Sequence, residues 1–205
     1  MTWLHSIFLW FYCQKLSHAA LLVVGISALF LLVNHWLVGR RAWRAAVFCL
    51  LLLGLAAILW STAWSRTPDE TAREAVLIPF YSYYTVLTGG EPELLRSNFM
   101  NILLFYPAGL FAAALLPRRW TLPKKLLCVA GLFAALSLGI ECVQYAARIG
   151  QAETDDVIHN TLGALLGGLA ATLPTTKVYR KQADKVCGRA QTRVKRWLAE
   201  EDTRA

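Results

Sequence analysis

The sequence predicts an all-α protein, a polytopic bundle of about five transmembrane helices in one compact unit. Of the 205 residues, 57% are hydrophobic and only 17% are charged, whereas a soluble domain carries about 25% charged residues. The mean hydropathy is +0.44. Several apolar runs approach or exceed the roughly 18–20 residues that span a bilayer. A soluble protein of this composition would have too little charge to coat its own surface.

The predicted spans follow the apolar runs in order along the chain. They cover residues 19–38, 43–64, 99–116, 126–147 and 157–173. The third and the fifth are close to the short limit, and each carries polar residues near its N-terminal end. Pro107 and Gly109 either kink the third span and open space near Asn101, or are tolerated in an ordinary helix. Gly163 and Gly167 form a small-xxx-small face that lets another helix approach closely.

The charges of the loops predict the orientation, because Lys and Arg are enriched on the cytoplasmic side of a membrane. The N-terminus is therefore expected outside and the C-terminus in the cytoplasm. The positive loops contain Arg40, Arg41 and Arg44, then Arg118, Arg119, Lys124 and Lys125, and they are followed by a basic tail. The loops expected outside contain Asp69, Glu70, Glu74, Glu91 and Glu93, and then Glu153, Asp155 and Asp156.

Two flanking segments surround the predicted bundle of residues 19–173. Residues 1–18 contain an apolar stretch too short to span, and they are expected to lie along the outer interface. No cleavable signal peptide is expected, because a basic n-region is missing. Residues 174–205 carry a helical stripe that includes Val186, Val194 and Trp197 among basic residues. This tail reads either as an amphipathic helix on the anionic cytoplasmic leaflet or as a simple solvated tail.

Residues 75–87 are apolar but too short to span, and Pro79 interrupts them. They form either a re-entrant or interfacial lid over the bundle, or an ordinary interfacial loop that Tyr81, Tyr83 and Tyr84 anchor.

Composition argues against several classes of function. The net charge of +8 is concentrated in the loops that set orientation, so nucleic acid is not an expected partner. The five cysteines are scattered, which favours buried free thiols over disulfides or a thiolate metal site. No nucleophilic triad, phosphate loop or dinucleotide fingerprint is present. No cofactor is expected.

Polar side chains inside the hydrophobic segments indicate the candidate site. Such groups are unfavourable in a bilayer and by default mark function. The direction of each predicted span brings these side chains to the outer third of the membrane, where Arg148 could pair with one of the acids. The candidate ligand-binding residues are Asn101, Ser137, Glu141, Gln144, Arg148, Asp155, Asp156 and Asn160.

An architectural interpretation competes with the functional one. Asn and Gln often join helices by hydrogen bonds, and Asp155 or Asp156 is well placed to cap the fifth span. Glu141 lies within its helix, however, where capping cannot explain it. A metal site of Asp155, His159 and Glu141 can be drawn, but one His with carboxylates is weak evidence. We expect no metal, and we expect His159 at the membrane interface.

These residues resemble the motifs of the VanZ-like family of bacterial membrane proteins. The resemblance covers about residues 77–168, and the pieces are specific in this order rather than singly. It implies an inner-membrane protein of the cell envelope. The family takes its name from low-level resistance to the glycopeptide teicoplanin, and nothing implies that this member meets an antibiotic. The matching pieces are Leu77-Ile-Pro79-Phe80, Asn101-x-Leu-Leu-Phe-x-Pro107-x-Gly109, Ser137-x-x-Ile-Glu141-x-x-Gln144, and Arg148 followed by Asp155-Asp156-x-x-x-Asn160-Thr161-x-Gly163-Ala-x-x-Gly167.

Three functions follow as hypotheses. The first is a non-enzymatic protein that binds the polar head of an envelope lipid or a lipid-linked cell-wall precursor, with an effect on glycopeptide susceptibility as one outcome. The second is a membrane enzyme that uses Glu141 with Asp155 and Asp156 for acid–base chemistry; a missing nucleophile and metal set make it the weaker hypothesis. The third, a proton-coupled carrier, is disfavoured because the acids are confined to the outer third. The oligomeric state and the ligand stay open.

Overall fold

The structure is a computed structural model. It describes residues 17–172 apart from 19, 22, 35–36, 38–40, 65, 69–74 and 90–92. The apolar N-terminal segment, the basic tail, and most of the acidic residues expected before the third span lie outside the described residues.

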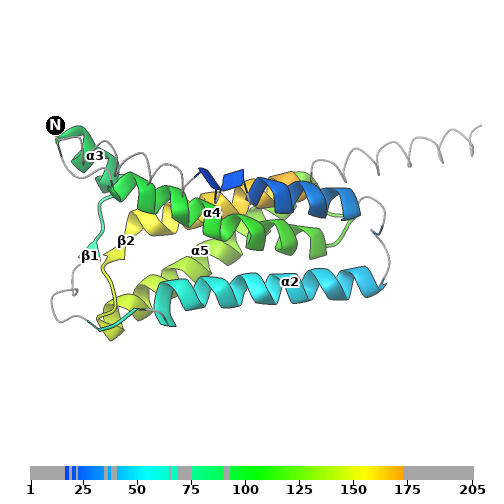
Figure 1. Ribbon diagram of the computed structural model, residues 1–205, viewed down its shortest axis with the longest axis horizontal. Coiled ribbons are helices and arrows are strands. Elements are labelled where there is room, and N and C mark those ends of the chain that lie inside the picture. Colours follow the sequence, from blue (N-terminus) through cyan, green and yellow to red (C-terminus); the bar gives the residue numbers. More distant parts are fainter. Residues whose placement is uncertain are drawn as a thin grey trace, which may run out of the picture.

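Long helices that run along the longest axis of the molecule form the body of the structure (Figure 1). They include α2 (Arg41–Leu59), which continues into the π-helical turn η1 (Trp60–Trp64), α4 (Glu93–Leu115) and α5 (Leu122–Ala147). These three are long and apolar enough to cross a membrane. The apolar helix Val23–Asn34 lies within the first predicted span. Residues 154–172 form a further helix, within which the described part of the fifth predicted span lies.

Two of the long helices begin earlier than the hydrophobic pattern predicts. α4 starts at Glu93, six residues before the predicted start at position 99, because Glu93 and Arg96 interrupt the apolar pattern there and an acidic side chain favours a helix N-terminus. α5 starts at Leu122 with a proline in its first two positions, where the missing N–H has no helical partner to lose. Hydropathy shows the apolar part of a helix and leaves out first turns that contain charged residues or proline.

The described residues are mostly helical, as the all-α prediction has it, and one short strand pair is added to the helices. β1 (Ala75–Val76) and β2 (Ala152–Glu153) form a two-residue parallel ladder, in which Ala75 pairs with Ala152 and Val76 with Glu153. The short helix α3 (Tyr81–Leu87) follows β1. Figure 1 shows α3, β1 and β2 together at one end of the molecule. This ladder joins the segment before α4 to the segment before the helix of residues 154–172.

Close backbone packing places the helix of residues 154–172 against α4. A Cβ on Gly167 would lie 2.0 Å from the carbonyl oxygen of Tyr106, and one on Gly163 would lie 2.3 Å from that of Ile102. A Cβ on Gly109, from the α4 side, would lie 2.1 Å from the oxygen of Ala164. The two glycines predicted to permit close approach do so, and Gly109 completes the contact from α4, which runs without interruption through its proline.

Apolar side chains fill the interior and also cover the outside. Phe105 and Phe133 pack edge to face in the core, with ring centroids 6.1 Å apart. Leu53 on α2 and Leu127 on α5 are instead 66% and 74% exposed. Apolar surface on long apolar helices is typical of contact with lipid rather than water.

Candidate functional site

A carboxylate on the helix of residues 154–172 holds α3 in place. Asp155 is buried, and its oxygens accept hydrogen bonds from the backbone N–H of Phe80, from the hydroxyl of Ser82 and, at 2.9 Å, from the N–H of Ser82. The amide of Asn98 on α4 donates to the same Ser82 hydroxyl at 2.7 Å. Asp155 is therefore a helix cap, as the architectural interpretation expects, but it caps α3 rather than its own helix.

His159 strengthens the same attachment. His159 is 2% exposed, so it packs inside the protein, and its place at the membrane interface stays a prediction. Nδ1 faces the backbone carbonyl of Asp155, which can only accept, and Nδ1 therefore carries the proton. Nε2 lies 2.8 Å from the hydroxyl of Tyr83. With both ring nitrogens in use, His159 serves the packing of α3, and the described residues contain no group of three His, Cys, Asp or Glu that could hold a metal ion.

The β1–β2 ladder brings a new carboxylate to the predicted site. Glu153 lies in β2, and its backbone N–H donates to Oε2 of Glu141 at 2.9 Å. Glu141 is 4% exposed on α5. A buried carboxylate needs donors, and the start of the following segment supplies this one. The backbone of Glu153 is thus held beside the carboxylate of Glu141.

Two hydrogen bonds, one helical turn apart, join the helix of residues 154–172 to α4 and to α5. Near the surface, the amide of Asn101 on α4 donates to Oδ1 of Asp156 at 2.7 Å. One turn deeper, the amide of Asn160 donates to the hydroxyl of Ser137 on α5 at 2.8 Å. The Oδ1 atom of Asn160 is buried and has no hydrogen-bond partner among the described residues. It is an acceptor that still lacks a donor.

Gln144 joins α5 to the end of α2 and leaves a second acceptor unpaired. Its Nε2 donates at 2.8 Å to the carbonyl of Thr62 in η1, a carbonyl in the last helical turn that lacks a helical partner. Gln144 is 1% exposed, and its Oε1 has no partner among the described atoms. Gln144 lies one turn beyond Glu141 on α5, and Asn160 is bonded to Ser137, one turn before Glu141 on the same helix.

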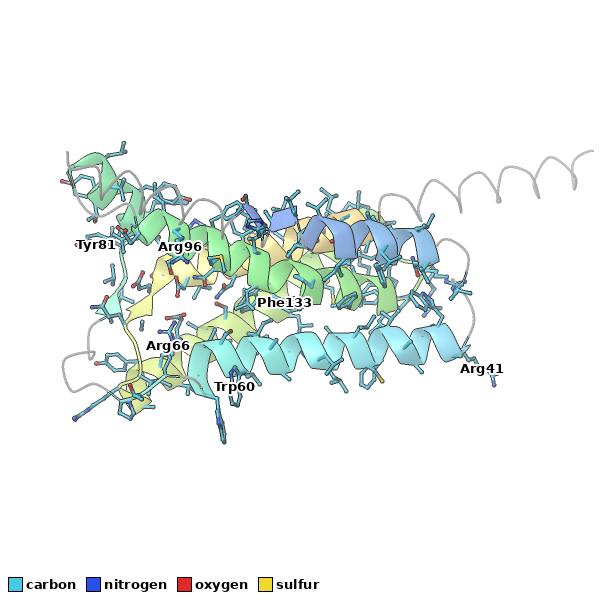
Figure 2. All side chains as sticks on the ribbon, viewed as in Figure 1. Arg41, Trp60, Arg66, Tyr81, Arg96 and Phe133 are labelled. Carbon is cyan, nitrogen blue, oxygen red and sulfur yellow. The ribbon has the colours of Figure 1, made fainter. Side chains whose placement is uncertain are left out.

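Three carboxylates and one guanidinium dominate the electrostatics of this end of the bundle. Glu141, Glu153 and Asp156 interact with one another and with Arg66. Figure 2 shows Arg66 at the same end as Tyr81 and Arg96, with Arg41 at the opposite end. Burial raises the pKa of the Glu153 carboxyl above its usual range, and the charges of Asp156 and Asp155 add to this, whereas Arg66 opposes it.

A groove of about 240 Å³ lies between α5, the β1–β2 ladder and the start of the helix of residues 154–172. Glu141 and Glu153 are its acidic members, and the rest of the lining is mostly apolar. Leu138 and Tyr145 line it from the outward face of α5, where they are 57% and 40% exposed. The groove therefore opens on the side of the molecule that carries apolar surface, with acids along its wall. We name it the lateral groove.

The structure brings most of the predicted site residues to one end of the bundle but gives them different surroundings. Six of them take part in the hydrogen bonds that join the helices and β2 at this end: Asn101, Ser137, Glu141, Gln144, Asp156 and Asn160. Asp155 instead faces α3. Arg148 takes the left-handed C-cap position of α5, with φ of 57°, and its side chain is exposed. The guanidinium that acts on the acids belongs to Arg66.

Sequence reasoning missed Arg66, Ser82, Asn98 and Glu153 as members of these networks. Asn98 had a signal, because it lies one helical turn before Asn101 and on the same face. Glu153 stands two positions before Asp155, and was counted only as a loop charge. Arg66 and Ser82 carry no local signal, because tertiary hydrogen bonds such as those of Gln144 to Thr62 and of Asp155 to Ser82 bring their segments near the site.

Apolar helices of spanning length with a polar site at one end define a helical membrane protein. Comparison with known families matches residues 45–174 to VanZ/LLP1. The match covers more than half of the chain, which therefore belongs to this family. It begins within α2, so it extends beyond the motif resemblance in the sequence, which starts at about position 77. No curated protein and no solved structure gives a significant match.

Proposed function

We propose that this VanZ-family protein binds the polar head of an envelope lipid, or of a lipid-linked cell-wall precursor, in the bacterial inner membrane. One observation carries the proposal: two carboxylates, Glu141 and Glu153, line an otherwise mostly apolar groove that opens on the apolar side of the molecule. A ligand that suits both features has hydrogen-bond donors at one end and hydrocarbon at the other. Membrane lipids have this form.

The residues of the site have different roles in binding. Glu141, Glu153 and Asp156 accept hydrogen bonds from the head of the lipid. Asn101 orients Asp156 through its 2.7 Å hydrogen bond, and the oxygens of Gln144 and Asn160 offer further acceptors. Arg66, rather than the Arg148 expected from the sequence, binds a phosphate of the lipid head. Asp155, Ser82 and His159 hold α3 and contribute no ligand contact.

We further propose about five spans, with the N-terminus outside and the C-terminus in the cytoplasm, on the basis of the positive-inside rule. The site then faces the outer side of the membrane. Cys13 and Cys187, both outside the described residues, test this orientation in intact cells. An impermeant thiol reagent should label Cys13 and leave Cys187 unlabelled, and the reverse pattern would show that the orientation is inverted.

The binding itself is tested by native mass spectrometry of the protein purified from bacterial membranes. We expect a specific lipid to remain on the wild type and to be lost from Glu141→Gln and Asp156→Asn. Glu93→Gln is the matched control, because Glu93 is an exposed glutamate on α4 outside the site. The same lipid in the same amount on all four proteins would refute the proposal.

An effect on teicoplanin susceptibility follows if the bound lipid is a precursor that a glycopeptide recognises. Bacteria that express the wild type should then differ in the inhibitory concentration of teicoplanin from those that express Glu141→Gln. Equal concentrations would remove glycopeptides from the proposal and leave lipid binding intact.

Acid–base chemistry on the same lipid is the second candidate. The observation in its favour is the mutual interaction of Glu141, Glu153 and Asp156, since neighbouring carboxyl groups can divide into a proton donor and an acceptor. Release of product from a radiolabelled form of the co-purified lipid would establish it, and unchanged lipid after prolonged incubation would exclude it.

A further inference from the structure

The lateral groove is shaped to take part of a lipid from the side. Its volume of about 240 Å³ is below the range of roughly 300–1,000 Å³ that encloses a whole drug-sized ligand. Leu77, Leu138 and Tyr145 on its rim are 74%, 57% and 40% exposed. Since α5 is long and apolar enough to cross a membrane, this rim faces hydrocarbon. The groove can thus hold one stretch of acyl chain while the rest stays in the bilayer.

The carboxylates in and beside the groove favour a positively charged group. The carboxylates of Glu141, Glu153 and Asp156 interact with the guanidinium of Arg66, and Asp155 adds a further negative charge beside Glu153 and Asp156. Carboxylates therefore outnumber guanidinium groups in these interactions. The interior therefore repels an anionic head that lacks a compensating cation.

The unpaired groups near the acids point to the same chemistry. Gln144 and Asn160 are 1% and 2% exposed, and each has an amide oxygen without a donor, while their amide nitrogens are taken by Thr62 and Ser137. All of these free positions are acceptors. A primary ammonium group offers three N–H donors and a full positive charge, and so complements both the charge and the acceptors.

Arg66 supplies a positive charge that acts on both acids of the groove. Its Nη1 lies 2.5 Å from the position that a Cβ on Gly150 would take, so the glycine makes room for the guanidinium beside Gln144. Arg66 itself is exposed. An ammonium inside and a phosphate at the edge are the two charges of an aminophospholipid, and Arg binds phosphate well through its forked donors.

We propose that the lateral groove binds an aminophospholipid taken directly from the bilayer, with its ammonium between Glu141 and Glu153, its phosphate at Arg66 and one acyl chain along Leu138. This inference rests on the proposed function, because it names the class of lipid that the same site binds.

The test uses the full chain in nanodiscs that contain equal amounts of phosphatidylethanolamine, phosphatidylglycerol and a neutral glucosyl diacylglycerol with identical acyl chains. Native mass spectrometry after release into detergent then reads the lipids retained. We expect the wild type to enrich phosphatidylethanolamine, and Glu141→Gln and Glu153→Gln to lower this enrichment about tenfold, as loss of a hydrogen bond to a charged group does. Glu93→Gln should retain it.

A second pair of variants tests the path of the acyl chain without touching the acids. Leu138 and Leu132 both lie on α5 and are both 57% exposed, but only Leu138 lines the groove. Leu138→Trp should fill the groove and abolish the enrichment, whereas Leu132→Trp should leave it unchanged. Equal enrichment in both tryptophan variants would overturn the proposed path of the chain.

The outcomes separate this inference from the proposed function. Enrichment of the neutral glycolipid, lost in Glu141→Gln, would overturn the aminophospholipid and leave lipid binding standing. Enrichment of phosphatidylglycerol would likewise overturn the selection for an ammonium group. Retention of the three lipids in bulk proportion, with no difference between the wild type and Glu141→Gln, would overturn both.

Discussion

The Oδ2 atom of Asp155 accepts a hydrogen bond of 2.9 Å from the backbone N–H of Ser82, a residue 73 positions earlier in the chain. The bond attaches α3, which is only seven residues long, to the start of the helix of residues 154–172. A helix this short is marginal by itself in water. Its place therefore depends on contacts of this kind rather than on its own hydrogen bonds.

Asp155→Ala should detach α3 and lower the free energy of unfolding by about 1–3 kcal/mol, because it removes a helix cap and leaves buried donors unpaired. The measurements are thermal unfolding in detergent and limited proteolysis of residues 77–89. Thr88→Ala is the control, since its exposed hydroxyl bonds only within the local turn. An unchanged unfolding temperature and cleavage rate in Asp155→Ala would show that α3 is held by other contacts.

Tyr83→Phe should lower stability by about 1 kcal/mol through loss of the hydrogen bond to Nε2 of His159. The stacking of the two rings, with centroids 5.7 Å apart, is kept in this variant, so the hydrogen bond is isolated. Tyr84→Phe removes a hydroxyl from a side chain that is 66% exposed and should have no effect. The measurement is the thermal unfolding midpoint of the two variants. Equal midpoints would show that the Tyr83–His159 hydrogen bond does not contribute to stability.

Gly167→Ala should destabilise the bundle by about 1–3 kcal/mol, as overpacking of a tight interior does. The new Cβ would lie 2.0 Å from the carbonyl oxygen of Tyr106 and 2.8 Å from the backbone nitrogen of Leu110, and backbone atoms cannot move aside as a side chain can. Unfolding in detergent gives the difference.

Gly139→Ala is the matched control for this change, because nothing lies within 4 Å of the Cβ it would add. It should stabilise α5 by about 0.5–1 kcal/mol, the usual gain for replacing an unconstrained helical glycine. If Gly167→Ala and Gly139→Ala behave alike, α4 and the helix of residues 154–172 are not in backbone contact.

Glu153→Gln should change how stability depends on pH. The pKa of the Glu153 carboxyl is raised by burial, so the folded protein holds this proton more tightly than the unfolded chain does. The wild type should therefore lose stability relative to Glu153→Gln as the pH rises from the ordinary pKa of glutamate to the raised one, and the difference should be constant above and below this window. Unfolding temperatures across the acidic range test this, and Glu93→Gln should run parallel to the wild type.

The sequence predicts well what depends on one helix or on the direction of neighbouring helices. Glu141, Gln144 and Ser137 share a face of α5 because of their spacing, and the opposite direction of the next helix brings Asn160 to Ser137. The close approach at Gly163 was predictable for the same reason.

The parts that were missed depend on contacts between distant segments. β1 and β2 have two residues each, too few for a periodic pattern, and yet their pairing brings Glu153 to Glu141. Asp155 has the sequence signature of a cap for its own helix, but its oxygens accept from three donors at the start of α3, the backbone N–H groups of Phe80 and Ser82 and the hydroxyl of Ser82. Propensity describes the chain near a residue, whereas these placements are tertiary.

The hydrogen bond between Glu153 and Glu141 connects the site to α3. The bonds of Asp155 and the β1–β2 ladder connect α3 to the segment that contains Glu153, so we expect a displacement of α3 to move this segment. Movement of that segment withdraws an N–H donor from the buried carboxylate of Glu141. The position of α3 is thereby coupled to the hydrogen bonding of the Glu141 carboxyl group inside the bundle.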